Sequence, residues 1–114
     1  MSDCLFCKIA EQKIPAKVVY EDEQCVAFDD INPQAPTHTL VIPKRHVASL
    51  AELNEADAGL LGHLMLTGAK VARQKGIAEG GYRIVVNTGR HGGQTVFHLH
   101  LHLLGGRPMH WPPG

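Results

Sequence analysis

Residues 97–102 alternate strictly between large apolar residues and histidines, and two further leucines follow. The odd-numbered positions hold the apolar residues Phe97, Leu99, Leu101 and Leu103. The even-numbered positions hold His98, His100 and His102. Successive side chains of a β-strand point to opposite faces, so this period predicts a strand over residues 97–104 with its apolar side chains in a core. The three imidazoles would lie in a row on the other face, about 6.8 Å apart, whereas a helix would scatter them around its circumference.

Four other short segments have the apolar composition of strands and end at turn signals. These segments are residues 18–21, 25–29, 38–43 and 82–87. The first two would form an antiparallel hairpin, and Pro33 and Pro36 favour an ordered loop ahead of the third. Together with the histidine segment, they predict a meandering antiparallel sheet of five strands.

The middle of the chain has helical periodicity. Asn54 is a suitable N-cap, and Gly76 suits a C-terminal stop. A helix of about 20 residues between them would have an apolar face, formed by Leu60, Leu61, Leu64, Ala69, Val71 and Ala72. A shorter helix of one or two turns is expected within residues 1–12, ahead of Pro15. No repeat or linker interrupts the pattern, so residues 1–114 are expected to form one α+β domain.

Charge and cysteine content exclude several classes of function. Eleven basic and eleven acidic residues cancel, so we expect no binding to nucleic acid or to an anionic membrane. No apolar run approaches the roughly 20 residues of a membrane span, and the polar N-terminus does not resemble a signal peptide. Three cysteines do not make a disulfide framework, and a reducing, cytoplasmic location is expected.

The histidine row and the glycine-rich loop before it suit phosphate chemistry. Neutral imidazole can attack phosphorus and form a covalent intermediate, while a second imidazole donates to the phosphoryl oxygens or to the leaving group. Gly92 and Gly93 would let backbone N–H groups approach a phosphate, with further donors from Asn87, Gln94 and Thr95. Two alternatives compete with this interpretation: the histidines are tolerated polar residues, or they bind a metal ion such as zinc. One metal held by all three would have to bridge about 13 Å along an unbent strand.

The signature His-φ-His-φ-His-φ-φ, in which φ is apolar, spans residues 98–104 and resembles the histidine triad (HIT) superfamily. Its nucleotide-binding branch is similar to this chain over residues 28–31, 34–38, 40–43, 92–94 and 105–114. The resemblance implies a HIT-like fold, with a five-stranded antiparallel sheet, one long helix and one short helix. It also implies a hydrolase of purine nucleoside 5′-phosphoramidates, such as AMP joined to an amine or to lysine, that works through a covalent nucleotidyl-histidine and binds AMP or GMP. The alternatives are another HIT activity, such as dinucleoside polyphosphate hydrolysis or nucleotidyl transfer, and a nucleotide-binding regulatory protein whose turnover is incidental.

The resemblance implies a role for each matching residue. His100 would be the nucleophile, His102 would bond the phosphate and assist the leaving group, and His38 would orient His100. Asp30 would bind the ribose hydroxyls. The purine would lie among Leu5, Phe6, Ile9, Phe28 and Ile31. The phosphate and leaving-group side would be held by Asn87, Gly93, Gln94 and Thr95, the last in place of the family's usual serine.

The resemblance further implies a homodimer in which two five-stranded sheets join into one of ten strands. Its C-terminal tail, here around Trp111, would reach the partner's active site and shape the leaving-group preference. The sequence itself indicates only that a tryptophan inside a proline-rich terminal segment is docked rather than free.

Cys4 and Cys7 form a Cys-x-x-Cys pair, which is half of a zinc site and by itself a weak signal. Some HIT relatives are similar here and complete a tetrahedral zinc site with two histidines. By that analogy the ligands would be Cys4, Cys7, His46 and His98. The zinc would be structural, and catalysis would require no metal. The alternative is a pair of reduced thiols near the base pocket, while Cys25 is expected in the core.

Overall fold

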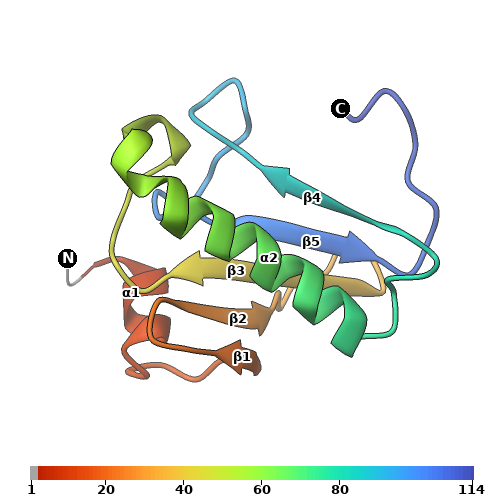
Figure 1. Ribbon diagram of the computed structural model, residues 1–114, viewed down its shortest axis with the longest axis horizontal. Coiled ribbons are helices and arrows are strands. Elements are labelled where there is room, and N and C mark those ends of the chain that lie inside the picture. The colour runs from red at the N-terminus through yellow and green to blue at the C-terminus, as the bar shows by residue number, and fades with distance from the viewer. Residues whose placement is uncertain (1–2) are drawn as a thin grey trace.

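The computed structural model describes residues 3–114, which form a sheet with a helix on each face (Figure 1). The helices are α1 (Leu5–Ala10) and α2 (Ala58–Gln74). The strands are β1 (Val18–Glu21), β2 (Cys25–Asp29), β3 (Thr37–Pro43), β4 (Tyr82–Val86) and β5 (Leu101–Gly105). Two 3₁₀ turns, Leu50–Glu52 and Glu55–Asp57, precede α2. This architecture confirms the predicted antiparallel sheet of five strands with one long and one short helix.

The order of the strands across the sheet is β1-β2-β3-β5-β4, and all neighbours are antiparallel. The expected simple meander is therefore wrong for the last two strands. After β3 the chain crosses one face of the sheet as α2 and enters β4 at the far edge (Figure 1). β5 then returns between β3 and β4, where it gains partners on both sides. The C-terminal part of the histidine row thus lies in the middle of the sheet.

The two faces of the sheet bury different residues because neighbouring positions of each strand point to opposite sides. The side chains that pack with α2 include Cys25, Ala27, Val41, Leu101 and Leu103. The alternate positions pack with α1, which contributes Phe6, Ile9 and Ala10 to a core that also contains Val26, Phe28, Leu40 and Ile42. The expectation that Cys25 is a core residue is confirmed, since its side chain is fully buried.

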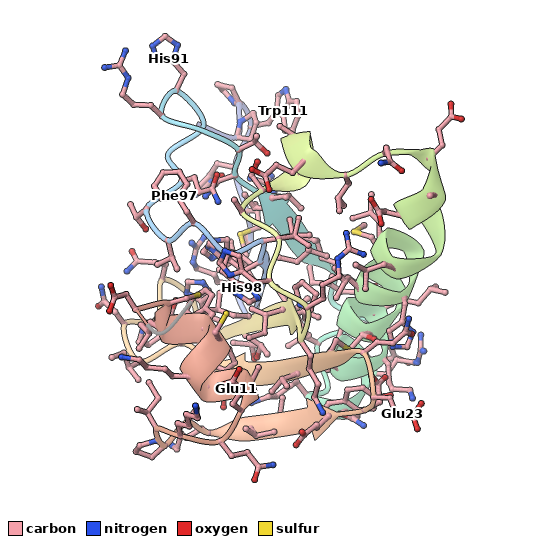
Figure 2. All side chains as sticks on the ribbon, turned by 90° about the vertical axis from the view of Figure 1, so that its left-hand side faces the viewer. Glu11, Glu23, His91, Phe97, His98 and Trp111 are labelled. Carbon is pink, nitrogen blue, oxygen red and sulfur yellow. The ribbon has the colours of Figure 1, made fainter. Side chains whose placement is uncertain are left out.

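The predicted strand over residues 97–104 is only partly correct. Leu99, Leu101 and Leu103 are buried as expected, but Phe97 is 57% exposed and β5 begins only at Leu101. Ahead of β5 the Leu99 N–H donates to the Val47 carbonyl in a loop, 2.7 Å away, rather than to a neighbouring strand. His98 is fully buried and points inward, whereas Phe97 lies on the outside (Figure 2). The alternation of apolar residues and histidines therefore begins four residues before β5 and covers a segment that is not a strand.

The start of α2 follows the capping signal. The Asn54 side chain accepts from the Ala56 N–H, and the Asp57 carboxylate accepts from the Asn54 N–H in a capping box. This box closes the 3₁₀ turn, and regular α-helix begins one residue after it. Gly76 ends the helix at φ 77°, a conformation that glycine adopts without strain. None of the described helices is long and apolar enough to cross a membrane.

Candidate active site

A cavity of about 490 Å³ opens on the face of the sheet that α1 covers. Nine of the residues expected to bind or process a nucleotide line it: Leu5, Phe6, Ile9, Phe28, Asp30, Ile31, Thr95, His100 and His102. Residues that the sequence did not indicate complete the wall: Ile14, Pro15, Ala16, Asp29, Leu40 and Val96. They come from separate segments, and no local pattern marks them. The structure thus brings the expected apolar wall and two histidines of the row into one cavity.

His100 is 6% exposed and lies at the inner wall of this cavity. Its Nδ1 atom is 2.7 Å from the His98 carbonyl oxygen and must donate to it, because a carbonyl only accepts. The neutral ring then has an unprotonated Nε2 atom. The Phe6 ring meets the His100 ring edge-on, with centroids 5.1 Å apart at 90°, and limits its rotation. His100 is therefore held in the tautomer that a nucleophile needs at Nε2.

His102 has the opposite tautomer, which a chain of hydrogen bonds determines. The Gln34 backbone N–H donates to Nδ1 of His38 at 3.0 Å, so the proton of neutral His38 is on Nε2. That Nε2–H lies 2.9 Å from Nδ1 of His102 and donates to it. Neutral His102 must then carry its own proton on Nε2. The cavity contains one imidazole with a free lone pair and one with a hydrogen-bond donor.

The expected contact between His38 and His100 is wrong. His38 orients His102, and the His98 backbone orients His100. Nothing in the local sequence around Gln34 indicated that its N–H would fix this arrangement. The three side chains Asp30, His38 and His102 lie close together, with Oδ2 of Asp30 at 3.5 Å from Nε2 of His38.

Both paired histidines are neutral at physiological pH. Burial, together with the neighbouring His100 and His38 rings, lowers the pKa of His102 to about 4 against the opposing effect of the Asp30 carboxylate. Burial also lowers the pKa of His38, against the attraction of the Asp30 carboxylate. The hydrogen-bond directions derived for neutral rings therefore hold at pH 7.

The glycine-rich loop of residues 88–95 uses several of its expected phosphate donors in hydrogen bonds to the protein backbone. The Gln94 amide donates to the carbonyls of Ala48 and Val96, at 2.7 and 3.0 Å, and its oxygen accepts from the Gly89 N–H. The Gly93 and Gln94 backbone N–H groups are used inside the loop, on Arg90 and Gly89. Asn87, Gly93 and Gln94 do not line the cavity, and only Thr95 does. In this structure Gly93 and Gln94 shape the loop, and their contacts with a phosphate stay a prediction.

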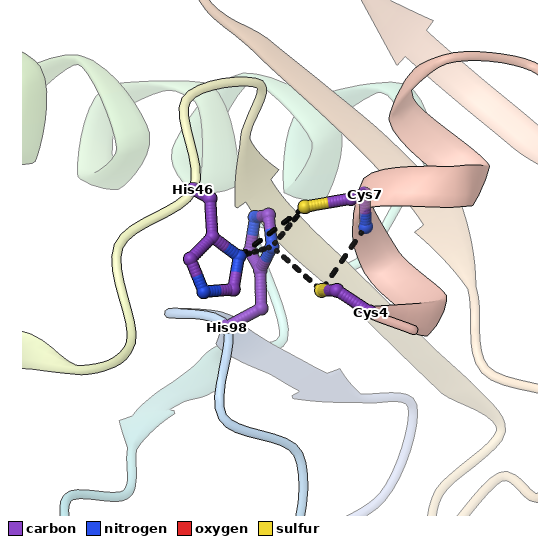
Figure 3. A group of neighbouring side chains, drawn as sticks. All are labelled: Cys4, Cys7, His46 and His98. Carbon is purple, nitrogen blue, oxygen red and sulfur yellow. Dashed lines mark hydrogen bonds between the residues drawn. The ribbon is translucent and has the colours of Figure 1, made fainter. Parts of the chain in front are cut away.

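A second cluster lies beside the cavity and joins four side chains from distant parts of the chain (Figure 3). They are Cys4, Cys7, His46 and His98, whose potential ligand atoms all lie within 4.8 Å of one another. Sγ of Cys4 is 3.3 Å from Nδ1 of His98, and Sγ of Cys7 is 3.2 Å from Nδ1 of His46. The two Nδ1 atoms are 3.2 Å apart. The structure thus assembles all four residues expected around a zinc ion.

The chemistry of this cluster fits zinc. Tetrahedral bonds to sulfur and nitrogen separate neighbouring ligand atoms by roughly 3.3–3.8 Å, close to the distances found here. Nε2–H of His98 donates to the Pro43 carbonyl at 2.8 Å, which leaves its Nδ1 lone pair facing the two sulfurs. Burial and the adjacent Cys4 thiol raise the pKa of Cys7 to about 11, so a thiolate here needs a cation beside it. Among the described residues, no group able to hold one metal contains two histidines of the row.

The protein-family comparison matches residues 11–109 to the HIT domain. The chain belongs to the HIT family. An uncharacterized HIT-like protein of Synechococcus elongatus is 57% identical over 112 residues, which are 98% of this chain and 97% of that protein. A crystal structure of a HIT family hydrolase from Legionella pneumophila is 54% identical, with a TM-score of 0.96 over 98% of this chain and all of that one.

Two more distant HIT structures indicate ligands bound within the family. A zinc-bound histidine triad family protein from Mycobacterium smegmatis is 35% identical, with a TM-score of 0.79 over 93% of this chain and 76% of that one. A histidine triad nucleotide-binding protein from Candida albicans is 31% identical, with a TM-score of 0.82 over 96% and 83% of the two chains. These similarities support a hydrolase of the HIT type.

Trp111 of this HIT protein lies at the periphery and is 81% exposed (Figure 2). Its ring contacts the Arg83 guanidinium, 5.9 Å from the centroid, and Arg83 also donates to the His110 carbonyl. The expected docking of Trp111 is therefore not made within the single chain. A role toward a partner subunit remains an expectation of the resemblance.

Proposed function

We propose that this protein hydrolyses purine nucleoside 5′-phosphoramidates through a covalent nucleotidyl intermediate on His100. The observation that carries the proposal is the opposite tautomers of His100 and His102 on one cavity wall. A phosphoryl transfer through histidine needs an unprotonated ring nitrogen as nucleophile and a donor for the phosphoryl oxygens. The cavity supplies one of each.

The proposed reaction has two displacements at phosphorus. In the first, Nε2 of His100 attacks phosphorus, the P–N bond to the amine breaks, and the amine leaves with a proton taken from solvent water. Nε2–H of His102 donates to a phosphoryl oxygen, where negative charge accumulates, and so assists this departure. In the second, water attacks the phosphorus and gives up a proton to solvent, the P–N bond to His100 breaks, and the nucleoside monophosphate is released with neutral His100 regenerated.

The walls of the cavity suit the rest of a nucleotide. Phe6, Ile9 and Phe28 are buried and apolar, whereas Leu5 and Ile31 are 49% and 97% exposed at its border. This arrangement lets a flat purine enter between apolar side chains. We propose that the Asp30 carboxylate accepts from the ribose hydroxyls and that the Thr95 hydroxyl serves the phosphate side. The similarity to the histidine triad nucleotide-binding protein from Candida albicans supports a nucleotide as the ligand of this cavity.

We propose that Cys4, Cys7, His46 and His98 hold a structural zinc ion. Four protein ligands fill a tetrahedral site and leave no open position, so the metal would take no part in the chemistry. The zinc-bound relative from Mycobacterium smegmatis supports the choice of metal. Zinc thiolates require reduced cysteines, and all three cysteines are free, which favours a reducing compartment such as the cytoplasm.

We also propose a homodimer that joins two sheets through β4. This strand forms an edge of the sheet and has unpaired backbone groups along its outer side. Apolar side chains of β4 and α2 are exposed, with Tyr82 at 37%, Met65 at 42% and Leu66 at 71%. Light scattering on the purified protein would give about twice the chain mass for the dimer and the chain mass alone if the proposal is wrong.

The covalent intermediate offers a direct test. His102→Ala protein is mixed briefly with an AMP-amine phosphoramidate and examined by intact-protein mass spectrometry. We expect a mass increase of one AMP, because weakened stabilisation of the second step lets the adduct accumulate. The increase should be absent from the His100→Ala/His102→Ala double variant. Unchanged turnover after His100→Ala alone, with no adduct in any variant, would overturn the mechanism. Comparing the turnover of the phosphoramidate with that of a dinucleoside polyphosphate would show whether the enzyme prefers to cleave a P–N or a P–O bond.

A further inference from the structure

Helix α1 belongs to the candidate zinc site and to the nucleotide cavity at the same time. Cys4 caps the helix, its sulfur accepting from the Cys7 N–H, and both cysteines face His98. The residues between and after them, Leu5, Phe6 and Ile9, line the cavity. The same helical turn therefore presents one set of side chains to the metal and the adjacent set to the nucleotide.

Phe6 is the contact between the two sites. Its ring meets those of Phe28, His98 and His100 at centroid distances of 5.5, 6.0 and 5.1 Å, all edge-on. Phe28 and His100 belong to the cavity, whereas His98 belongs to the zinc cluster. A displacement of α1 would therefore move the wall of the base site and the support of His100 together.

His98 makes the second connection, through its backbone. Its ring is fixed by Nδ1 in the metal cluster and by Nε2 on the Pro43 carbonyl. Its own carbonyl accepts the proton of Nδ1 of His100 at 2.7 Å. A metal ion bound to Nδ1 of His98 would hold this carbonyl in the position that orients the nucleophile.

The helix is too short to be stable without these anchors. It has six residues, whereas isolated helices shorter than about 12 residues are marginal in water. Its N-terminal cap is a sulfur at 3.3 Å, which is a weak acceptor. Without the metal, α1 would be held only by apolar packing and by thiol–imidazole contacts to the two histidines, and thiols form weak hydrogen bonds. The position of α1 should therefore depend on whether zinc is bound.

We propose that zinc binding and nucleotide binding in this protein are thermodynamically linked through α1 and His98, so that each ligand raises the affinity of the other. The inference rests on the proposed function, because it requires a nucleotide in the cavity. Linkage is reciprocal: if zinc tightens AMP binding by a given factor, AMP must tighten zinc binding by the same factor. A zinc ion that served stability alone, without positioning the nucleotide site, would have the same affinity whether or not AMP was bound.

The test measures both sides of this linkage on the full chain. Zinc affinity is determined by competition with a chelating dye, with and without saturating AMP, and a titration without protein corrects for zinc bound by AMP. AMP affinity is determined by calorimetry on zinc-loaded and zinc-free protein. We expect both affinities to change by the same factor, on the order of tenfold.

Two cavity variants locate the coupling. Phe6→Ala keeps all four metal ligands but removes the ring between the sites, so the factor should fall to the part transmitted by the His98 carbonyl. Ile14→Ala shortens a wall residue outside α1 and should weaken AMP binding while the factor persists. AMP binding with a factor of one in the wild-type protein would overturn the linkage and leave the proposed function intact. A zinc-loaded protein that does not bind AMP would overturn both, and a protein that does not bind zinc would overturn the linkage.

Discussion

Nε2 of His38 lies 2.9 Å from Nδ1 of His102, and this contact determines which side of His102 carries a proton. The Gln34 N–H occupies the other nitrogen of His38, so the direction of donation is set by the backbone. His38 therefore orients His102, the proposed phosphate donor, rather than His100, the proposed nucleophile. The series of hydrogen bonds runs from the Gln34 backbone N–H to His38, from His38 to His102, and from His102 to the proposed substrate.

Replacement of His38 should lower turnover more than it weakens substrate binding. In His38→Ala, His102 has no partner at Nδ1 and populates both tautomers, so we expect kcat to fall by about 10- to 100-fold with a smaller change in KM. His38→Gln keeps an N–H donor near the same place and should recover part of the loss. Steady-state kinetics and ¹⁵N spectra of the His102 ring would check the two effects. Equal activity of the alanine and wild-type proteins would contradict the positioning role.

Acid should destabilise the protein through His102. Its pKa is lowered to about 4 by burial and by the His100 and His38 rings, while an unfolded histidine has a pKa of about 6.5. The unfolded chain therefore binds more protons between these values, and the free energy of unfolding falls as the pH decreases from 6.5 to 4. His102→Gln should reduce this fall by about 2 kcal/mol, after allowance for partial exposure. Urea denaturation of both proteins at pH 7 and pH 4 measures the difference, and parallel pH profiles would contradict it.

The turn between β1 and β2 is tied to α2 by Asp22, which sequence analysis did not single out. Its Oδ1 accepts from the N–H groups of Gln24 and Cys25, and its Oδ2 accepts from the Tyr20 hydroxyl and from His63. These bonds outweigh the effect of burial, which raises the carboxyl pKa, and hold it well below its usual range.

Asp22→Asn should cost about 2 kcal/mol of stability, because its amide group would face donors that need an acceptor. Glu23→Gln is a matched control in the same turn, where the side chain is exposed, and should change stability by less than about 0.5 kcal/mol. The difference in urea midpoint between the two variants gives the result. Equal midpoints would show that the tie between the turn and α2 is dispensable.

The sequence predicted the positions of helices and strands along the chain better than it predicted which strands lie side by side in the sheet. Strand alternation and the Asn54 capping signal are local properties, and the structure has β1, β2 and α2 close to where these patterns place them. The order of β4 and β5 depends on how α2 crosses the sheet, which no local pattern specifies. Phe97 fits the apolar parity of the row but lies outside, because the chain leaves the sheet before Leu101.

The same limit applies to the site. The resemblance indicated the residues of the cavity and of the zinc cluster, since these types occur at matching positions. It placed His38 on the wrong histidine, because His38 and His102 are 64 positions apart and their hydrogen bond depends on strand register. β3 and β5 pair Leu40 with His102, and the His38 ring reaches the adjacent imidazole from two positions along the strand. Such contacts require the assembled sheet.

Gln94 offers a test of whether the loop is a structural element or a phosphate-binding one. Its amide joins Gly89, Ala48 and Val96, so Gln94→Ala should leave these groups without partners and lower stability by about 2 kcal/mol. If Gln94 bound the phosphate instead, the variant would lose affinity for AMP while its affinity for adenosine stayed the same. We expect the ratio of the two dissociation constants to stay unchanged as the urea midpoint falls.

Gln24→Ala is the matched control for this substitution, because Gln24 lies exposed in the turn after β1. It should change neither the urea midpoint nor the ratio of AMP to adenosine affinity. A selective loss of AMP affinity in Gln94→Ala, at wild-type stability, would identify Gln94 as a phosphate ligand. That result would require the loop to release its internal hydrogen bonds when the nucleotide binds. The Gln94 amide donates to two backbone carbonyls and accepts from one backbone N–H in this structure.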